Sequence, residues 1–157
     1  MKATVYVDGS YSTISNKGVY GGGIVLLLEG VPHPLFQTCN GDDTNIARLR
    51  NVAGELLATI SAVGILKSLP QYTELEICYD YEGIEKWVTG EWQAKKAFTI
   101  AYKKAMLEAQ QNLKMTFKKI AAHTGDEYNE KADKLAKEAV KEYARNIQSL
   151  HLEESRG

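Results

Sequence analysis

Four acidic side chains are placed where they could do chemistry together: Asp8, Glu55, Asp80 and Asp133. Asp8 and Asp80 each follow an alternating apolar run that predicts a β-strand, whereas Glu55 and Asp133 lie in stretches of helical period. Clustered carboxylates repel each other, and some stay protonated unless cations neutralise them. Oxygen ligands of this kind suit Mg²⁺ or Mn²⁺ and not zinc. Two such ions about 3.5–4 Å apart activate water for an in-line displacement at a phosphodiester.

Taken singly, each of these acids has a simpler interpretation. An aspartate at the end of a strand is commonly a turn or capping residue, and Glu55 alone is compatible with a charge on a helix surface. The joint pattern favours chemistry, because two acids follow strands and two lie on the inner edges of helices. If the first and fourth predicted strands are neighbours, all four acids can meet at one end of a sheet.

The first predicted strand, Ala3–Asp8, must position the centre of this cluster. Its alternating positions are largely apolar on both sides, which is typical of a central strand with both faces covered. We expect Asp8 at the C-terminal end of this strand, with Gly9-Ser10 as a turn. A carboxylate at the end of a central strand lies where open α/β sheets usually hold their ligands.

Hydrophobic period and breaker residues predict the remaining elements. Further strands are predicted at Val19–Leu28, Pro34–Thr38, Thr73–Tyr79 and Met115–Ala121. Helices are predicted at Asn45–Ser68, at a short segment ending at Val88 before Gly90, at Lys95–Asn112, and from the region after Asp126 to about Asn146. The run Gly21-Gly22-Gly23 lacks the Lys-Ser/Thr of a P-loop, so we interpret it as a strand that packs closely under a helix.

The two helical acids are expected beside the buried faces of their helices. The stripe of the Asn45–Ser68 helix is Leu49, Val52, Ala53, Leu56, Ile60 and Val63. Glu55 lies about 100° from the centre of that stripe, so we expect it at the edge of the buried face and not sealed in the core. Asp133 borders the stripe of the last helix in the same way; that stripe is Ala132, Leu135, Ala136, Ala139 and Tyr143.

Size and composition indicate one soluble domain. The chain has 157 residues, of which 44% are hydrophobic and 25% charged, which suits one compact core. We expect no membrane span and no signal peptide, since no apolar run is long enough and the first strand begins at once. Cys39 and Cys78 match no metal spacing, so we interpret them as two buried thiols of a cytoplasmic protein. We also expect a monomer.

The net charge of −1 hides an asymmetry along the chain. The segment from Lys86 to Lys119 holds eight lysines and two acids, and the remainder is acidic. A basic segment beside an acidic remainder fits a polyanionic ligand held next to a cation-binding centre. A solvated helix face is the plainer alternative for such a charge run.

Four segments of the sequence resemble the type 1 ribonucleases H. They are Tyr6-Val-Asp8-Gly-Ser10, Arg50-Asn51-Val-Ala-Gly-Glu55-Leu-Leu-Ala58, Tyr79-Asp80-Tyr-Glu-Gly-Ile84, and the stretch from Ala122 to Ala136 that contains His123, Asn129, Glu130 and Asp133. The last stretch is the most specific, because residue types and spacing both agree. The resemblance implies an α/β fold of the ribonuclease H type, with a five-stranded mixed sheet of order 3-2-1-4-5, the first three strands antiparallel, and helices on both faces. It also implies a catalytic domain over residues 1–146 and a polar C-terminal tail over residues 147–157, which we expect to fray.

The resemblance implies an endoribonuclease that hydrolyses the RNA strand of RNA–DNA hybrids and leaves 5′-phosphate and 3′-hydroxyl ends. Two Mg²⁺ ions, for which Mn²⁺ can substitute, would be held with Asp8 bridging both, Glu55 and Asp80 completing one site, and Asp133 the other. The matching His123 would aid proton movement and product release, although a lone histidine is more often structural. Glu130 matches an acid that lies near the metals in some relatives, and a capping role is equally compatible.

Residues matching hybrid contacts lie on several segments. The nucleic-acid contacts implied are Ser10, Asn51, Trp92, Lys95, Lys96 and Asn129. Asn51 matches a minor-groove contact, where the 2′-hydroxyl distinguishes RNA from DNA. Lysines supply phosphate contacts that are independent of sequence. Trp92 is a candidate for the DNA strand, whereas Trp87 is interpreted as core.

The sequence departs from the family in two segments near the site. Val52 stands where a second asparagine is often found, and Tyr81-Glu82 stands where Ser-Gln is common, which adds a carboxylate after Asp80. A non-catalytic module that binds RNA–DNA hybrids is the alternative function, against which the four acids and His123 weigh. A transposase- or integrase-type nuclease on the same fold would require a longer chain to hold DNA ends.

Overall fold

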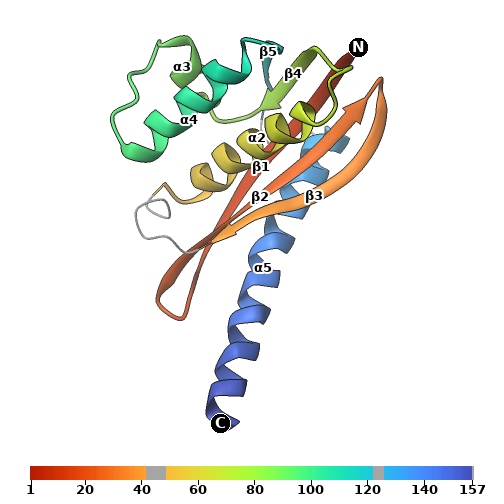
Figure 1. Ribbon diagram of the computed structural model, residues 1–157. Coiled ribbons are helices and arrows are strands. Elements are labelled where there is room, and N and C mark those ends of the chain that lie inside the picture. The colour runs from red at the N-terminus through yellow and green to blue at the C-terminus, as the bar shows by residue number, and fades with distance from the viewer. Residues whose placement is uncertain (42–48, 122–125, 157) are drawn as a thin grey trace.

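A five-stranded mixed sheet runs through the centre of the molecule (Figure 1). The structure is a computed structural model, and it describes residues 1–41, 49–121 and 126–156. The strands are β1 (Lys2–Ile14), β2 (Lys17–Leu28), β3 (Val31–Gly41), β4 (Glu74–Tyr79) and β5 (Lys114–Lys119). Their order is β3-β2-β1-β4-β5. The first three are antiparallel, and β4 and β5 run parallel to β1. The predicted fold class and strand order are confirmed.

Helices cover both faces of this sheet. They are α2 (Asn51–Lys67), α3 (Gly83–Thr89), α4 (Ala97–Ala109) and α5 (Glu127–Arg156). In Figure 1, α2 lies across one face with α3 and α4 beside it, and α5 crosses the other face and continues past the sheet. The described residues thus form three layers with β1 in the middle of the central one.

Glycines in β2 let both helices approach the sheet closely. A Cβ atom at Gly22 would lie 2.5 Å from the carbonyl oxygen of Gly54 in α2, and one at Gly23 would overlap the carbonyl oxygen of Ala132 in α5. Successive strand residues point to opposite faces, so adjacent glycines serve opposite helices. The interpretation of the glycine run as a site of close strand–helix packing is confirmed.

Strand β1 is longer than predicted, and Gly9-Ser10 is not a turn. The strand continues to Ile14 and pairs with β2 along its whole length, with Gly9 opposite Gly22. The turn lies at Ser15 and Asn16, where φ is 52° and 67°. The pairing of β1 with β4, in contrast, ends at Tyr6 and Cys78. Asp8 therefore lies just beyond the point where β1 stops pairing with β4. The sequence had predicted instead that Asp8 is at the end of the strand.

The boundaries of other helices and strands also differ from the predicted ones. The helix predicted from Asn45 begins at Asn51, and residues 42–48 lie outside the described residues. The strand predicted at Pro34–Thr38 extends over Val31–Gly41, because β2 offers a partner along that length. The helix predicted at Lys95–Asn112 is shorter at both ends, since α4 covers Ala97–Ala109. The strand predicted at Met115–Ala121 ends earlier, since β5 covers Lys114–Lys119.

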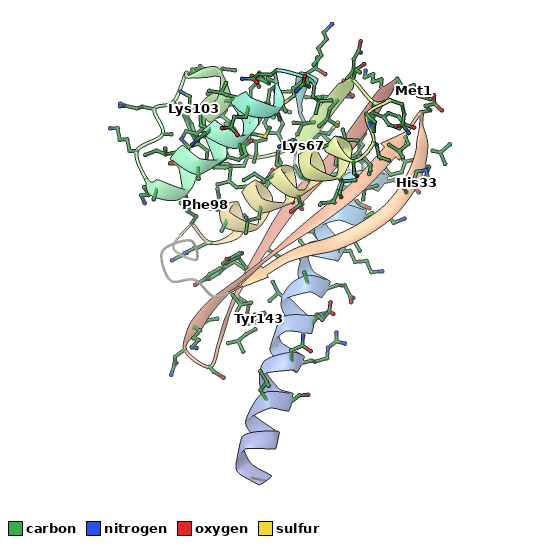
Figure 2. The ribbon with its side chains drawn as sticks, viewed as in Figure 1. Met1, His33, Lys67, Phe98, Lys103 and Tyr143 are labelled. Carbon is green, nitrogen blue, oxygen red and sulfur yellow. The ribbon has the colours of Figure 1, made fainter. Side chains whose placement is uncertain are left out.

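The last helix extends to Arg156, ten residues beyond the expected end at about Asn146, so the predicted tail is helical through that residue. Glycine and proline are absent from α5, and alanine, lysine and glutamate, which favour helices, are frequent. Tyr143 lies on α5 near the place where the helix leaves the sheet (Figure 2).

The core lies on both faces of the sheet, as the alternation in β1 predicted. Val5 and Val7 are buried on the α2 side with Leu56 and Ile77. On the other side the ring of Tyr6 lies 5.4 Å from that of Tyr128 in α5. Cys78 is buried with a free thiol, and the side chain of Cys39 lies outside what the structure describes. Among the described residues, none of the helices has the length and apolar character needed to span a membrane.

Candidate active site

Three carboxylates meet where β1 separates from β4. Asp8 comes from β1, Glu55 from α2, and Asp80 from the residue that follows β4. One carboxylate oxygen of each lies within 4.8 Å of the others. Parallel pairing of β1 and β4 brings Asp8 and Asp80 to the same end of these strands, and α2 contributes Glu55. The topology therefore collects acids that are far apart in sequence.

Asp133 of α5 reaches the same place from the opposite face of the sheet. A cavity of about 130 Å³ opens between these elements. Its lining residues are Asp8, Gly9, Asn51, Asp80, Asn129, Glu130 and Asp133. Asp133 contributes, after burial and Asp80, to the raised pKa of Asp8, because a neighbouring negative charge opposes ionisation of this carboxyl. All four acids singled out in the sequence thus belong to one cluster.

Glu55 is more deeply buried than expected, since only 1% of it is exposed. The expectation that it would lie at the edge of the buried face is wrong. The cause is Gly9, which has no side chain and lets the first turn of α2 lie directly on β1; a Cβ there would overlap the carbonyl oxygen of Asn51. The side chain of Glu55 still has a partner, because the backbone amide of Asp80 donates a hydrogen bond to its Oε1 at 3.3 Å.

Burial and like charge hold protons on this cluster. Burial, followed by the charge of Asp80, raises the pKa of Asp8 to about 7, although the amide of Gly9 donates to Oδ1 of Asp8 at 2.8 Å and opposes the shift. Burial and the charges of Asp80 and Asp8 raise the pKa of Glu55 well above its usual range. A divalent cation would replace those protons and remove the repulsion. The oxygen-only donor set and the cavity both fit a hard cation such as Mg²⁺.

Lys137 is a neighbour of the cluster that sequence reasoning missed. Its Nζ lies 2.9 Å from Oδ2 of Asp133, one turn earlier on α5. The i, i+4 spacing of an acid followed by a lysine on a helix is the signal that could have found it.

Glu82, the extra carboxylate after Asp80, is paired with two lysine side chains. It forms ion pairs with Lys86 at 3.2 Å and with Lys119 of β5 at 3.1 Å. These two lysines lower the pKa of Glu82, and Glu82 is not among the residues that line the cavity. The departure from the family pattern therefore adds a surface ion-pair network next to the site and not a fifth member of the acidic cluster.

The candidate nucleic-acid contacts are divided between the cavity and the surface. Asn51 and Asn129 line the cavity, Asn51 exposed and Asn129 buried. Ser10 is half-buried on β1 opposite Gly21. Lys95 and Lys96 are exposed immediately before α4. His123 lies outside the described residues, so its role stays a prediction.

Trp92 and Trp87 belong to one aromatic cluster with Tyr81. The ring centroids are 5.7 Å apart for Trp87 and Trp92, 5.8 Å for Tyr81 and Trp87, and 6.0 Å for Tyr81 and Trp92. Trp87 packs against the core, as expected. Trp92 is partly exposed, and the Nζ of Lys86 lies 5.4 Å from its ring. This cluster connects the segment after Asp80 to the basic segment before α4.

Comparison with known proteins decides the family. The model of the RNase H family matches residues 1–141, which include all four acids. The chain belongs to the ribonuclease H family. Members of this family are metal-dependent nucleases, which agrees with the carboxylate cluster.

Relatives named ribonuclease H cover most of the chain. The protein from Mesorhizobium japonicum is 34% identical over 147 residues, which are 87% of this chain and 76% of that relative. The protein from Rhizobium johnstonii is 34% identical over 152 residues, covering 88% and 91% of the two chains. Ribonuclease H sequences thus align with this chain over nearly its whole described length.

Solved structures confirm the fold. The RNase H1 of Halobacterium salinarum superposes with a TM-score of 0.72 at 22% identity, covering 90% of this chain and 99% of that one. LC11-RNase H1, solved in complex with an RNA/DNA hybrid, gives a TM-score of 0.68 at 22% identity, covering 90% and 98%. The ribonuclease H fold is therefore preserved at low sequence identity.

Proposed function

We propose that this chain is an endoribonuclease that hydrolyses the RNA strand of RNA–DNA hybrids. The observation that carries the proposal is the gathering of four carboxylates in a member of the ribonuclease H family. Asp8, Glu55 and Asp80 lie within 4.8 Å of one another, and Asp8, Asp80 and Asp133 line one cavity. A structural role alone does not account for this cluster, because unpaired buried carboxylates cost stability.

Two Mg²⁺ ions are the proposed cofactor, with Mn²⁺ as a substitute. Glu55 and Asp80 would hold one ion and Asp133 the other, with Asp8 shared between them. Bound there, the ions would supply an activated water and stabilise the leaving oxygen, giving 5′-phosphate and 3′-hydroxyl ends.

The residues of the chain itself would position these ligands before any ion arrives. The amide of Gly9 fixes Oδ1 of Asp8, and the amide of Asp80 fixes Oε1 of Glu55. Asp126 accepts hydrogen bonds from the amides of Tyr128 and Asn129 and so caps the start of α5, the helix that carries Asp133. The acids are therefore preorganised by backbone contacts, which favours a defined reaction geometry.

The hybrid itself is the proposed substrate because of what surrounds the cavity. Asn51 and Asn129 present amide groups beside the acids, where they could bond to a 2′-hydroxyl that only the RNA strand has. Exposed Lys95 and Lys96 would contact phosphates, and Trp92 would contact the DNA strand. The hybrid complex of LC11-RNase H1 supports this choice of substrate by analogy. All four acids come from one chain, so a monomer is sufficient and stays a prediction.

The test compares labelled RNA–DNA hybrid, duplex RNA and duplex DNA in Mg²⁺, for the wild type and for Asp80→Asn. We expect cleavage of the RNA strand of the hybrid alone by the wild type, and loss of that cleavage in the variant and in EDTA. Equal cleavage of all three duplexes would overturn the assignment, and so would unchanged activity in the variant. Tight hybrid binding without turnover in either Mg²⁺ or Mn²⁺ would instead identify a non-catalytic binding module.

A further inference from the structure

One cation is in direct contact with the acidic cluster. The ammonium of Lys137 lies 2.9 Å from Oδ2 of Asp133. The contact with Asp133 raises the pKa of Lys137, and the charge of Asp8 acts in the same direction. Among the residues that the structure describes, Lys137 alone lies within ion-pair distance of one of the four acids.

We propose that Lys137 is a positioning residue: it is the resident counter-ion of Asp133 and is displaced when a divalent cation binds between Asp8 and Asp133. This role rests on the proposed function, because it assumes that a divalent cation binds to these carboxylates. It concerns only the Asp133 side of the cluster. Among the described interactions, neither Glu55 nor Asp80 is in contact with Lys137.

The competition follows from which atoms of Asp133 are already engaged. Its carboxyl lines the cavity together with Asp8, and its Oδ2 is paired with the ammonium of Lys137. A cation that binds Oδ2 of Asp133 must share or replace the contact with Lys137, and a cation that binds elsewhere on this carboxyl still meets the repulsion of the ammonium charge. Lys137 thereby keeps Asp133 oriented in the metal-free protein and weakens the binding of the second ion.

Displacement of Lys137 requires no repacking. The side chain of Lys137 is 59% exposed and that of Asp133 is 29% exposed. A lysine ammonium on its flexible four-carbon stem is well hydrated, so it can turn into water when Asp133 takes another partner. A buried arginine pair would not be released in this way, because its loss would leave an unpaired charge inside the protein.

The experiment is a calorimetric titration of the full chain with Mn²⁺ alone, at low ionic strength, with circular dichroism to verify folding. Lys137→Met removes the charge, and Lys137→Arg retains it. The matched control is Lys141→Met, which makes the same change at an exposed position one turn further along α5. Asp133→Asn and the double variant Asp133→Asn/Lys137→Met show whether the effect passes through Asp133.

We expect Lys137→Met to tighten the weaker of two Mn²⁺ sites by about three- to tenfold, the size of one screened charge near a divalent ion. Lys137→Arg and Lys141→Met should bind as the wild type does, and adding Lys137→Met to Asp133→Asn should change nothing further. Unchanged or weaker Mn²⁺ binding in Lys137→Met would overturn the role of Lys137 alone, whether the wild type binds one Mn²⁺ or two. An equal gain in Lys141→Met would overturn it too. A wild type that binds no Mn²⁺ would overturn the proposed function as well.

Discussion

The backbone amide of Asp80 donates a hydrogen bond to Oε1 of Glu55 at 3.3 Å. The contact joins the end of β4 to a carboxylate on α2 that is 1% exposed. It fixes one oxygen of Glu55 beside two other acids, Asp8 and Asp80, in a place where a negative charge is costly. A costly group held in a defined position indicates a function that requires the charge.

Glu55→Gln separates the charge of this side chain from its shape. The amide oxygen can still accept from the amide of Asp80, but it no longer offers a charged ligand. We expect turnover of the hybrid to fall at least about 100-fold, because metal stabilisation of the reacting centre is worth several kcal/mol. The unfolding temperature in EDTA should stay the same or rise, because the amide of glutamine is neutral without binding a proton.

The matched control for this change is Glu108→Gln, at an exposed acid on α4. It should alter neither turnover nor stability. Wild-type turnover in Glu55→Gln would show that the buried carboxylate does not take part in the reaction.

The raised pKa of Asp8 makes the stability of the metal-free protein depend on pH. The folded protein binds more protons than the unfolded chain between the usual pKa of 3.8 and the folded value of about 7, so stability falls as pH rises through this range. Glu55 shifts in the same direction. In EDTA we expect the free energy of unfolding to drop by roughly 1–3 kcal/mol from pH 5 to pH 8.

Urea unfolding at several pH values measures this slope. Asp8→Asn should flatten it, and saturating Mg²⁺ should flatten it in the wild type, because bound cations take the place of protons. A metal-free protein that becomes more stable as pH rises over the same range would contradict the electrostatic description of the cluster.

Gly9 should be essential for stability, although the sequence indicates only a turn residue. In Gly9→Ala the new methyl group would overlap the carbonyl oxygen of Asn51 and lie 2.6 Å from the amide nitrogen of Glu55. Moving α2 away from β1 should cost about 2–3 kcal/mol of stability and also displace Glu55. Denaturant unfolding and hybrid turnover measure the two effects.

Gly64 provides the matched control on the same helix. A Cβ at Gly64 has nothing within 4 Å, so Gly64→Ala should stabilise α2 by about 0.5–1 kcal/mol. Equal effects of the two substitutions would show that close packing at Gly9 is not what places α2.

The sequence predicts the fold and the membership of the cluster well, because both depend on periodicity and element order. Alternating apolar residues in β1 marked a strand covered on both faces, and the joint pattern of two acids after strands and two acids on helices indicated the cluster. The burial of Glu55 could not be predicted, since it depends on a glycine in another element. The angle of Glu55 within its own helix gave no indication of how closely β1 would approach.

The lengths of individual strands and helices were predicted least well, because a strand's length depends on the strand that pairs with it. β1 continues past Asp8 because β2 remains beside it after β4 has separated. α5 continues past Asn146 without a sheet beneath it, and the polar character of that segment suggested a tail. Lys137 was missed for a different reason: in a chain with many lysines, a single exposed one is recognisable only by the acid one turn before it.

Lys95 and Lys96 should affect binding and not chemistry. Charge reversal of both, Lys95→Glu/Lys96→Glu, should raise the KM for hybrid and flatten its dependence on salt, because fewer counterions are released. The rate of single-turnover cleavage at saturating enzyme should stay close to that of the wild type. The control reverses the charges of Lys67 and Lys114, which are both exposed. Lys67 is at the opposite end of α2 from Glu55, and Lys114 lies beside the start of β4, at the opposite end from Asp80. Loss of single-turnover cleavage in the Lys95/Lys96 variant alone would place these lysines in the reaction itself.

The central claim is that four carboxylates from β1, α2, α5 and the end of β4 hold divalent cations together. Anomalous diffraction at the manganese edge, from crystals of this chain soaked in Mn²⁺, tests it most directly. We expect two peaks in the cavity, one near Glu55 and Asp80 and one near Asp133, both adjacent to Asp8. A cavity without manganese in crystals where all four carboxylates are ordered would contradict the account.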